Sequence, residues 1–228
     1  MCTSGKPVVM ISGANRGIGR AVARHLHETG YRLSLGSRHA GEIIAGQLHG
    51  HFDALDPAAA ERWVAQTLDH YGRVDALVHC AGVLRQVGLE SGSEDDLRHM
   101  LEVNVLGSWR LARAVYPHLK ACGRGRFIQL VSLSGKRVKG TSCGYPISKF
   151  AQLAIGQCVR NSGWDDGVRA VSICPSWVNT DMARDVCKLP PESMTQPEDI
   201  ARVVALLLSL PNEASVDEIR INCGLETC

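Results

Sequence analysis

The stretch SGANRGIG, Ser12–Gly19, decides the fold of this chain. It follows an apolar run typical of a buried strand and precedes an amphipathic pattern typical of a helix. The glycines at positions 13, 17 and 19 let the backbone turn tightly and approach a pyrophosphate, toward which the next helix would point its N–H groups. A strand, a glycine loop and a helix in this order predict a dinucleotide-binding unit.

The same alternation of strand and helix continues along the chain. β-rich apolar runs predict seven strands, at Pro7–Ser12, Arg32–Ser37, His49–Asp53, Val74–His79, Arg126–Ser132, Arg169–Cys174 and Val216–Ile221. Helical patterns predict five helices, at Gly17–Thr29, Pro57–Tyr71, Glu94–Lys120, Cys143–Asn161 and Gln196–Leu210. We therefore predict an α/β, single-domain Rossmann fold over residues 1–228, with a doubly wound, parallel, seven-stranded sheet and helices on both faces. A loop or short helix at Ala183–Met194 would then lie at the mouth of a site.

Composition excludes several classes of function. The 228 residues carry 25 basic and 23 acidic side chains, a net charge of +2, and no block of like charge that would indicate nucleic acid binding. The apolar run Val8–Ile11 is far too short to span a membrane, and the N-terminal residues lack a signal-peptide pattern, so we expect a cytoplasmic protein. The nine cysteines show no metal-ligand spacing, so we predict free thiols and no metal site.

The residues after the second predicted strand bear on which dinucleotide binds. A carboxylate at this place would accept hydrogen bonds from an adenosine ribose, but the chain has Ser37 and Arg38 there. A guanidinium binds a 2′-phosphate bidentately, and Arg16 in the glycine loop adds a second cation. Unless both arginines are ordinary surface charges, these residues favour NADP(H) over NAD(H).

The segment SGKRVKGTSCGYPISKF, Ser134–Phe150, places Tyr145 and Lys149 one helical turn apart. Such a pair by itself is usually a solvated pair on a helix surface. Beside a dinucleotide, a tyrosine can exchange a proton with the alkoxide that hydride addition to a carbonyl creates. A free phenol has a pKa near 10, and a nearby ammonium and an oxidised nicotinamide would both favour the phenolate. A lowering of about three units, roughly 4 kcal/mol, would let Tyr145 act as acid and base near neutral pH.

Taken in order, the motifs resemble the classical short-chain dehydrogenase/reductase family over essentially the whole chain. They are the glycine loop, VSLSG at residues 131–135, EVNVLGS at 102–108, the Tyr-x3-Lys pair and PSWVNTDM at 175–182. The resemblance implies an oxidoreductase that interconverts a ketone or aldehyde with an alcohol. It implies the catalytic residues Asn104, Ser132, Tyr145 and Lys149. Ser132 lies thirteen residues before Tyr145, which is the family spacing, and the rival Ser134 does not.

The family also implies what these residues do. Ser132 would orient the substrate oxygen, and Lys149 would reach the nicotinamide ribose as well as the phenol. Asn104 would hold a water that connects Lys149 to solvent. The implied cofactor-binding residues are Gly13, Asn15, Arg16, Gly17, Ile18, Gly19, Ser37, Arg38, Asp53, Ala54, Ala81, Gly82, Tyr145, Lys149, Pro175, Val178 and Thr180.

Two positions depart from the family pattern. The segment HCAG, His79–Gly82, has Cys80 where the family's Asn-Asn-Ala-Gly has its second asparagine. This puts in doubt the hydrogen bond by which that asparagine supports the central sheet, but not the cofactor contact of the Ala81–Gly82 backbone. Ser176 replaces a glycine, which is a small change.

Family position implies a substrate pocket flanked by Ser134, Cys143, Trp177, Met182 and the loop at 183–194. Trp177 fits core packing equally well, and Cys143 is expected to be an inert liner rather than a reactive thiol. Just after Ser132, KRVKG supplies Lys136, Arg137 and Lys139. These cations suggest an anionic substrate, against the alternative of a solvated loop.

The C-terminal segment LPNEASVDEIRIN, residues 210–222, resembles more loosely a branch that includes serine 3-dehydrogenase-like and broad carbonyl-reducing enzymes. That branch is usually tetrameric, and the family's subunit contacts use the helices at 94–120 and 143–161. We therefore expect a homo-oligomer, a tetramer or a dimer.

Two other functions stay open. A non-enzymatic dinucleotide sensor on the same fold would typically lack the tyrosine or the lysine, and this chain keeps both. An epimerase or dehydratase would carry a C-terminal extension for sugar nucleotides, whereas we expect this chain to stop after its last strand.

Overall fold

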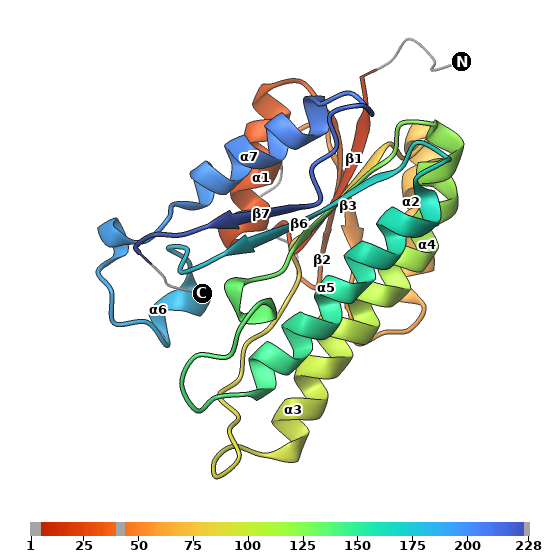
Figure 1. Cartoon of the computed structure of the whole chain (residues 1–228). Coiled ribbons are helices and arrows are strands. Elements are labelled where there is room, and N and C mark those ends of the chain that lie inside the picture. Colours follow the sequence, from red (N-terminus) through yellow and green to blue (C-terminus); the bar gives the residue numbers. More distant parts are fainter. Residues whose placement is uncertain (1–5, 40–43, 226–228) are drawn as a thin grey trace.

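The computed structural model describes residues 6–39 and 44–225. Their strands form one seven-stranded sheet (Figure 1). Its strands are β1 (Val8–Ser12), β2 (Arg32–Ser37), β3 (Leu48–His51), β4 (Ala76–His79), β5 (Arg126–Leu130), β6 (Arg169–Pro175) and β7 (Glu218–Ile221). They lie in the order β3-β2-β1-β4-β5-β6-β7, and every neighbouring pair is parallel. The predicted doubly wound sheet is confirmed, and its direction of winding reverses between β1 and β4. In such sheets, ligands bind outside the carboxyl ends of the strands at this reversal.

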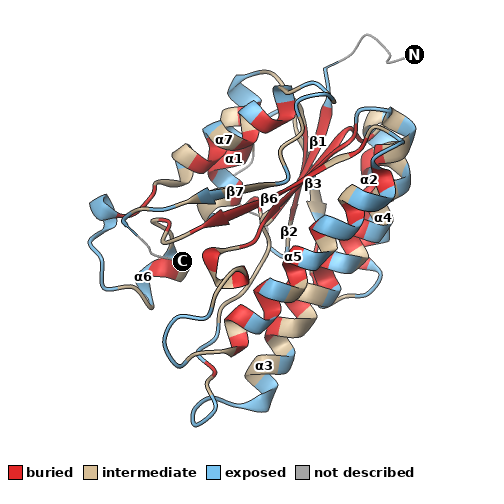
Figure 2. Ribbon diagram, in the orientation of Figure 1, coloured by how far each residue is buried: buried red, intermediate tan, exposed pale blue. Residues whose placement is uncertain are grey.

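Helices cover both faces of the sheet. On one face, α1 (Gly17–Glu28) packs beside α7 (Pro197–Ser209), and on the other lie α2 (Ala59–Tyr71), α4 (Ser108–Cys122) and α5 (Gly144–Gly163) (Figure 1). Side chains alternate along a strand, so in β1 Val9 and Ile11 pack toward α1 while Met10 packs toward α2. The central strands are therefore buried along their whole length, as Figure 2 shows, and this explains their nearly continuous apolar sequences.

One predicted helix is interrupted. The other predicted elements begin and end within two residues of their observed bounds, but the helix expected at Glu94–Lys120 is divided into α3 (Glu94–Leu101) and α4. Between them lies a π-helical turn, Glu102–Gly107. The Asn104 side chain bonds both backbone groups of Val83, at 2.9 Å each, and Ser108 Oγ donates to the Asn104 carbonyl at 2.7 Å. These contacts with the chain after β4 favour the wider turn over a regular helix.

A 3₁₀ turn, Leu133–Gly135, follows β5, and two more short elements belong to the loop after β6. They are α6 (Asp181–Arg184) and a 3₁₀ turn, Pro191–Ser193, so the expected loop or short helix at Ala183–Met194 contains both kinds of structure. Among the described residues, no helix is long and apolar enough to cross a bilayer, and no group of three side chains could hold a metal ion. The seven described cysteines are free thiols.

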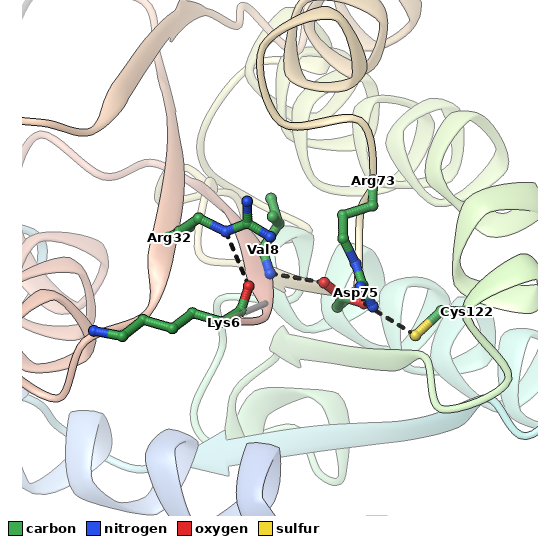
Figure 3. Close-up of polar contacts among 6 residues, drawn as sticks. All are labelled: Lys6, Val8, Arg32, Arg73, Asp75 and Cys122. Atoms are coloured by element: carbon green, nitrogen blue, oxygen red, sulfur yellow. Dashed lines mark hydrogen bonds and ion pairs between the residues drawn. The ribbon is translucent and has the colours of Figure 1, made fainter. Parts of the chain in front are cut away.

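A buried carboxylate joins the amino ends of β1 and β4 (Figure 3). Asp75 accepts hydrogen bonds from the Val8 backbone N–H at 2.8 Å, from Arg73 Nε at 3.0 Å and from Cys122 Sγ at 3.1 Å. Burial and the bond to Asp75 both raise the pKa of the Cys122 thiol, which keeps it a donor. Asp75 therefore ties the first strand, the fourth strand and the end of α4 together.

We predict that Asp75→Ala lowers the free energy of unfolding by about 2–3 kcal/mol, because the buried Val8 N–H loses its partner and Arg73 loses a charge-assisted bond. Urea unfolding followed by circular dichroism measures this. Asp69→Ala removes an exposed carboxylate from α2 and serves as the control, with a change within about 0.5 kcal/mol. Equal unfolding midpoints for the two variants would show that the Asp75 contacts contribute little.

Candidate active site

A cavity of about 660 Å³ lies at the carboxyl ends of the strands. Its walls come from the segments that follow β1 to β6, so residues far apart in the sequence meet there. Every residue expected to bind the cofactor lines it: Gly13, Asn15, Arg16, Gly17, Ile18, Gly19, Ser37, Arg38, Asp53, Ala54, Ala81, Gly82, Tyr145, Lys149, Pro175, Val178 and Thr180. Sequence reasoning missed His39 and Phe52, among others, because nothing in their local pattern distinguishes them from ordinary strand-end residues.

The glycine loop has the shape that a pyrophosphate requires. Gly13 has a φ of +67°, and a Cβ there would lie 3.0 Å from the Ala81 backbone nitrogen. A Cβ on Gly19 would lie only 2.3 Å from the Gly13 carbonyl oxygen, so the start of α1 packs directly on the loop. No side chain caps α1 and no acidic residue lies in its first turn. The first N–H groups of this helix therefore fit an anion, and the loop fits a dinucleotide.

Ser37 and Arg38 line the cavity at the end near β2, and Arg16 of the glycine loop lines it as well. Both arginines have exposed side chains, and Ser37 Oγ donates to the His39 carbonyl at 2.7 Å. Asp53 lines the same end and accepts a hydrogen bond from the Leu55 N–H at 3.0 Å. The predicted adenosine-binding residues therefore line one cavity.

Three of the four expected catalytic residues line the cavity. The Ser132 side chain hydrogen-bonds to Tyr145, and Lys149 Nζ lies 5.5 Å from the centre of the Tyr145 ring. The Lys149 ammonium donates to the Leu130 carbonyl at 3.2 Å and to Gln152 Oε1 at 2.6 Å. Sequence reasoning missed Gln152, whose only signal is its position three residues after Lys149.

The fourth residue, Asn104, lies behind the wall and is fully buried. Besides its two bonds to Val83, its amide nitrogen donates to Ser148 Oγ at 3.0 Å. Asn104 therefore joins the segment after β4 to α5, which carries Tyr145 and Lys149. Its expected role in holding a water stays a prediction.

Burial has the largest effect on the pKa values of Tyr145 and Lys149. It raises the pKa of Tyr145 above the ordinary value, against the bond from Ser132, and it lowers the pKa of Lys149 to about 8. The net lowering of the phenol pKa that was expected beside an oxidised nicotinamide is therefore not present in the groups of this chain alone. The reason is that removal from water destabilises a phenolate more than the Ser132 hydroxyl stabilises it.

A buried histidine joins β1, β4 and α4 just behind the glycine loop. His79 Nδ1 lies 2.6 Å from Ser12 Oγ, and its Nε2 lies 2.7 Å from Ser108 Oγ. Ser12 Oγ also accepts from the backbone N–H groups of Cys80 and Ala81 at 3.1 and 3.2 Å. Burial lowers the pKa of His79 to about 3, so the ring is neutral. Thus His79 and Ser12 give the central sheet polar support at the segment where Cys80 replaces an asparagine.

Most of the residues that were expected to flank the substrate pocket line the cavity. Ser134, Trp177 and Met182 line the cavity, whereas Cys143 is not among the lining residues. Arg137 and Lys139 also line it. Lys136 instead forms an ion pair with Glu218 at 2.8 Å, which a local reading of KRVKG could not reveal.

Residues 7–189 match the family model described as short chain dehydrogenase. The chain belongs to this family. The predicted family is thereby confirmed.

Known relatives agree with this assignment. An agropine synthesis reductase from Rhizobium rhizogenes is 34% identical over 97% of this chain, which spans 53% of that relative, or about half its length. The granaticin polyketide synthase putative ketoacyl reductase 2 from Streptomyces violaceoruber is 30% identical, covering 87% of this chain and 88% of the relative. An alcohol dehydrogenase from Thermococcus sibiricus, solved in complex with 5-hydroxy-NADP, superposes with a TM-score of 0.85 at 30% identity, over 95% of this chain and 96% of that one.

Proposed function

We propose that this protein is an NADP(H)-dependent oxidoreductase that interconverts a ketone or aldehyde with an alcohol, with Tyr145 as the group that gives and takes the proton. One observation carries the proposal: Ser132, Tyr145 and Lys149 share a wall of the cavity that the glycine loop also lines. A sensor has no need of a hydroxyl, a phenol and an ammonium at one place, so this arrangement favours an enzyme over the sensor.

The cofactor supplies the hydride when it is bound. In reduction, the Tyr145 phenol donates a proton to the substrate oxygen, and the Ser132 hydroxyl orients that oxygen. Because burial raises its pKa, Tyr145 is protonated at neutral pH and ready to act as an acid. After donation, the bond from Ser132 and the nearby charge of Lys149 stabilise the phenolate. In oxidation, the same groups take the proton from the alcohol.

We predict that Tyr145→Phe lowers kcat at least about 100-fold, because the ring keeps its packing but loses the proton that it transfers. Its affinity for NADPH, measured by fluorescence titration, should stay nearly unchanged. Tyr116→Phe, which lies on α4 outside the cavity lining, is the matched control and should keep full activity. Turnover of Tyr145→Phe at the wild-type rate would disprove the role of the phenol.

NADP(H) is favoured over NAD(H) because Arg16, Ser37 and Arg38 all line the cavity, and no carboxylate directly follows β2. Two guanidinium groups and a hydroxyl suit a 2′-phosphate, whereas a ribose without the phosphate would gain little from them. The solved relative in complex with 5-hydroxy-NADP agrees with this choice.

We predict that Arg38→Ala weakens NADPH binding about 10-fold or more, since a hydrogen bond to a charged group contributes about 1.5–3 kcal/mol. NADH binding should change less than 2-fold, roughly, because NADH lacks the phosphate. Fluorescence titration with each dinucleotide measures both, and Arg20→Ala, exposed on α1 outside the lining, is the control. An equal loss for both dinucleotides would mean that Arg38 does not read the phosphate.

An anionic substrate is supported by two cations at the other end of the cavity. Arg137 and Lys139 line it together with Ser132, Ser134 and Tyr145. Asp181, an acidic residue that also lines the cavity, pairs with Arg184 at 3.4 Å. The charges of Arg137 and Lys139 would attract a carboxylate or phosphate on the substrate.

We predict that the wild-type protein turns over 4-carboxybenzaldehyde with a higher kcat/KM than benzaldehyde, and that the difference shrinks with added salt. In the double variant Arg137→Ala/Lys139→Ala, the ratio of kcat/KM for 4-carboxybenzaldehyde to that for benzaldehyde should fall about 10-fold. Its kcat/KM with benzaldehyde should stay unchanged. Lys136→Ala, which removes the cation that pairs with Glu218, should keep the preference. Equal kcat/KM values for the two aldehydes in the wild-type protein would count against an anionic substrate.

The expected homo-oligomer also stays a proposal. Exposed apolar side chains lie on the two helices that the family uses for subunit contacts, namely Trp109 on α4 and Ile147 and Phe150 on α5. These side chains support a contact between copies of the chain along α4 and α5.

A further inference from the structure

The Lys149 ammonium depends on one side-chain acceptor. Lys149 is 4% exposed, and its ammonium donates hydrogen bonds to the Leu130 carbonyl at 3.2 Å and to Gln152 Oε1 at 2.6 Å. Gln152 lies nearly one turn further along α5 and is fully buried. A buried charge needs such acceptors, because its solvation by water is lost.

The amide of Gln152 is costly to bury at this place. Among the described residues, its nitrogen has no hydrogen-bond partner, and neither does the side-chain oxygen of the adjacent Gln129. Gln129 Nε2 donates to the backbone carbonyl of Gln152 at 3.1 Å and to Ser172 Oγ at 2.9 Å. The Gln129 amide occupies space that a side chain at Gly156 would fill. An unpaired buried polar group costs about 1–3 kcal/mol, which an apolar side chain of the same size would avoid. The bond to Lys149 is the contact that offsets this cost.

We propose that Gln152 is a positioning residue whose amide oxygen holds the Lys149 ammonium beside Tyr145 and keeps it protonated. This rests on the proposed function, in which the charge of Lys149 stabilises the phenolate. It adds a residue that touches neither the substrate nor the cofactor and acts through Lys149 alone.

The described titratable groups around Lys149 are uncharged and leave its ammonium without a carboxylate partner. They are Tyr145 on the same helix, His79 and Cys80 at the end of β4, and Cys174 on β6, behind which Lys136 pairs with Glu218. Burial raises the pKa of Cys80 to about 12 and that of Cys174 to about 11, so both thiols are uncharged at neutral pH. His79 and Tyr145 are neutral as well. The side-chain oxygen of Gln152 and the backbone carbonyl of Leu130 are therefore the dipoles that stabilise the Lys149 ammonium.

Two substitutions should move the pKa of Lys149 in opposite directions. Gln152→Met keeps the length of the side chain but removes the amide acceptor, so the ammonium is less stable and the pKa falls from about 8 by about one unit. Gln152→Glu places a carboxylate at the same position, so the pKa rises by about one unit or more. The ¹³Cε resonances of the six lysines, titrated in the full-length protein with Lys149→Met for assignment, report the change directly.

Turnover should follow the same shifts. Activity needs protonated Lys149, so kcat falls as the pH rises through the pKa of this group. The alkaline limb of the kcat–pH profile should therefore move about one unit lower in Gln152→Met and higher in Gln152→Glu. A purely structural role would change stability in both variants without moving the limb in opposite directions.

Gln129→Met is the matched control, because it removes a buried amide from the same layer without touching Lys149. It should leave both the Lys149 resonance and the alkaline limb in place. The proposal is overturned if the Lys149 pKa stays fixed in both Gln152 variants, if Gln129→Met moves it equally, or if the pKa moves and the limb does not. Failure of the wild-type protein to turn over any carbonyl would refute the proposed function, while the titration would still decide the contact between Gln152 and Lys149.

Discussion

The site depends on holding the ends of β1 and β4 together. The winding of the sheet reverses between these strands, so the chain leaves β1 toward α1 on one face and leaves β4 toward the other. Gly13 approaches the Ala81 backbone so closely that a side chain has no room, and Ser12 Oγ joins His79 and two backbone N–H groups. Because His79 also bonds Ser108, and Ser108 bonds the Asn104 carbonyl, a chain of hydrogen bonds connects the glycine loop to the π-helical turn. The glycine loop and the wall that carries Tyr145 thereby keep a fixed relation.

Burial then sets the protonation of that wall. It favours the neutral forms of both Tyr145 and Lys149, which raises the pKa of the phenol and lowers that of the ammonium. An exposed pair would have nearly equal pKa values and little effect on each other, because water screens charges. In the buried pair, a single proton transfer from the phenol creates a charge that Lys149 and Ser132 are placed to stabilise. Burial therefore costs stability in the resting protein and strengthens the electrostatic response during the reaction.

The sequence predicts most of the fold because its signals are local. Apolar runs and helical patterns mark each element, and the glycine loop fixes the parallel arrangement. The π-helical turn could not be predicted, because it depends on Asn104 meeting Val83, a contact between segments that are joined only in the folded chain. The same holds for Lys136, whose partner Glu218 lies 82 residues further along. The direction of the pKa of Tyr145 was also beyond the sequence, because it follows from burial rather than from the spacing to Lys149.

The two ends of the sheet use buried polar groups differently. At the amino ends, the Asp75 carboxylate accepts bonds from three different residues, so a charge that is costly to bury is well compensated. Behind the catalytic wall, Gln152 and Gln129 each leave one amide atom without a partner among the described residues. If Gln152 and Gln129 served stability alone, two apolar side chains would be more favourable at these positions, because they would remove two unpaired polar atoms. The bond from Lys149 to Gln152 supplies the missing reason, since a buried ammonium needs hydrogen-bond acceptors in place of the water that it has lost.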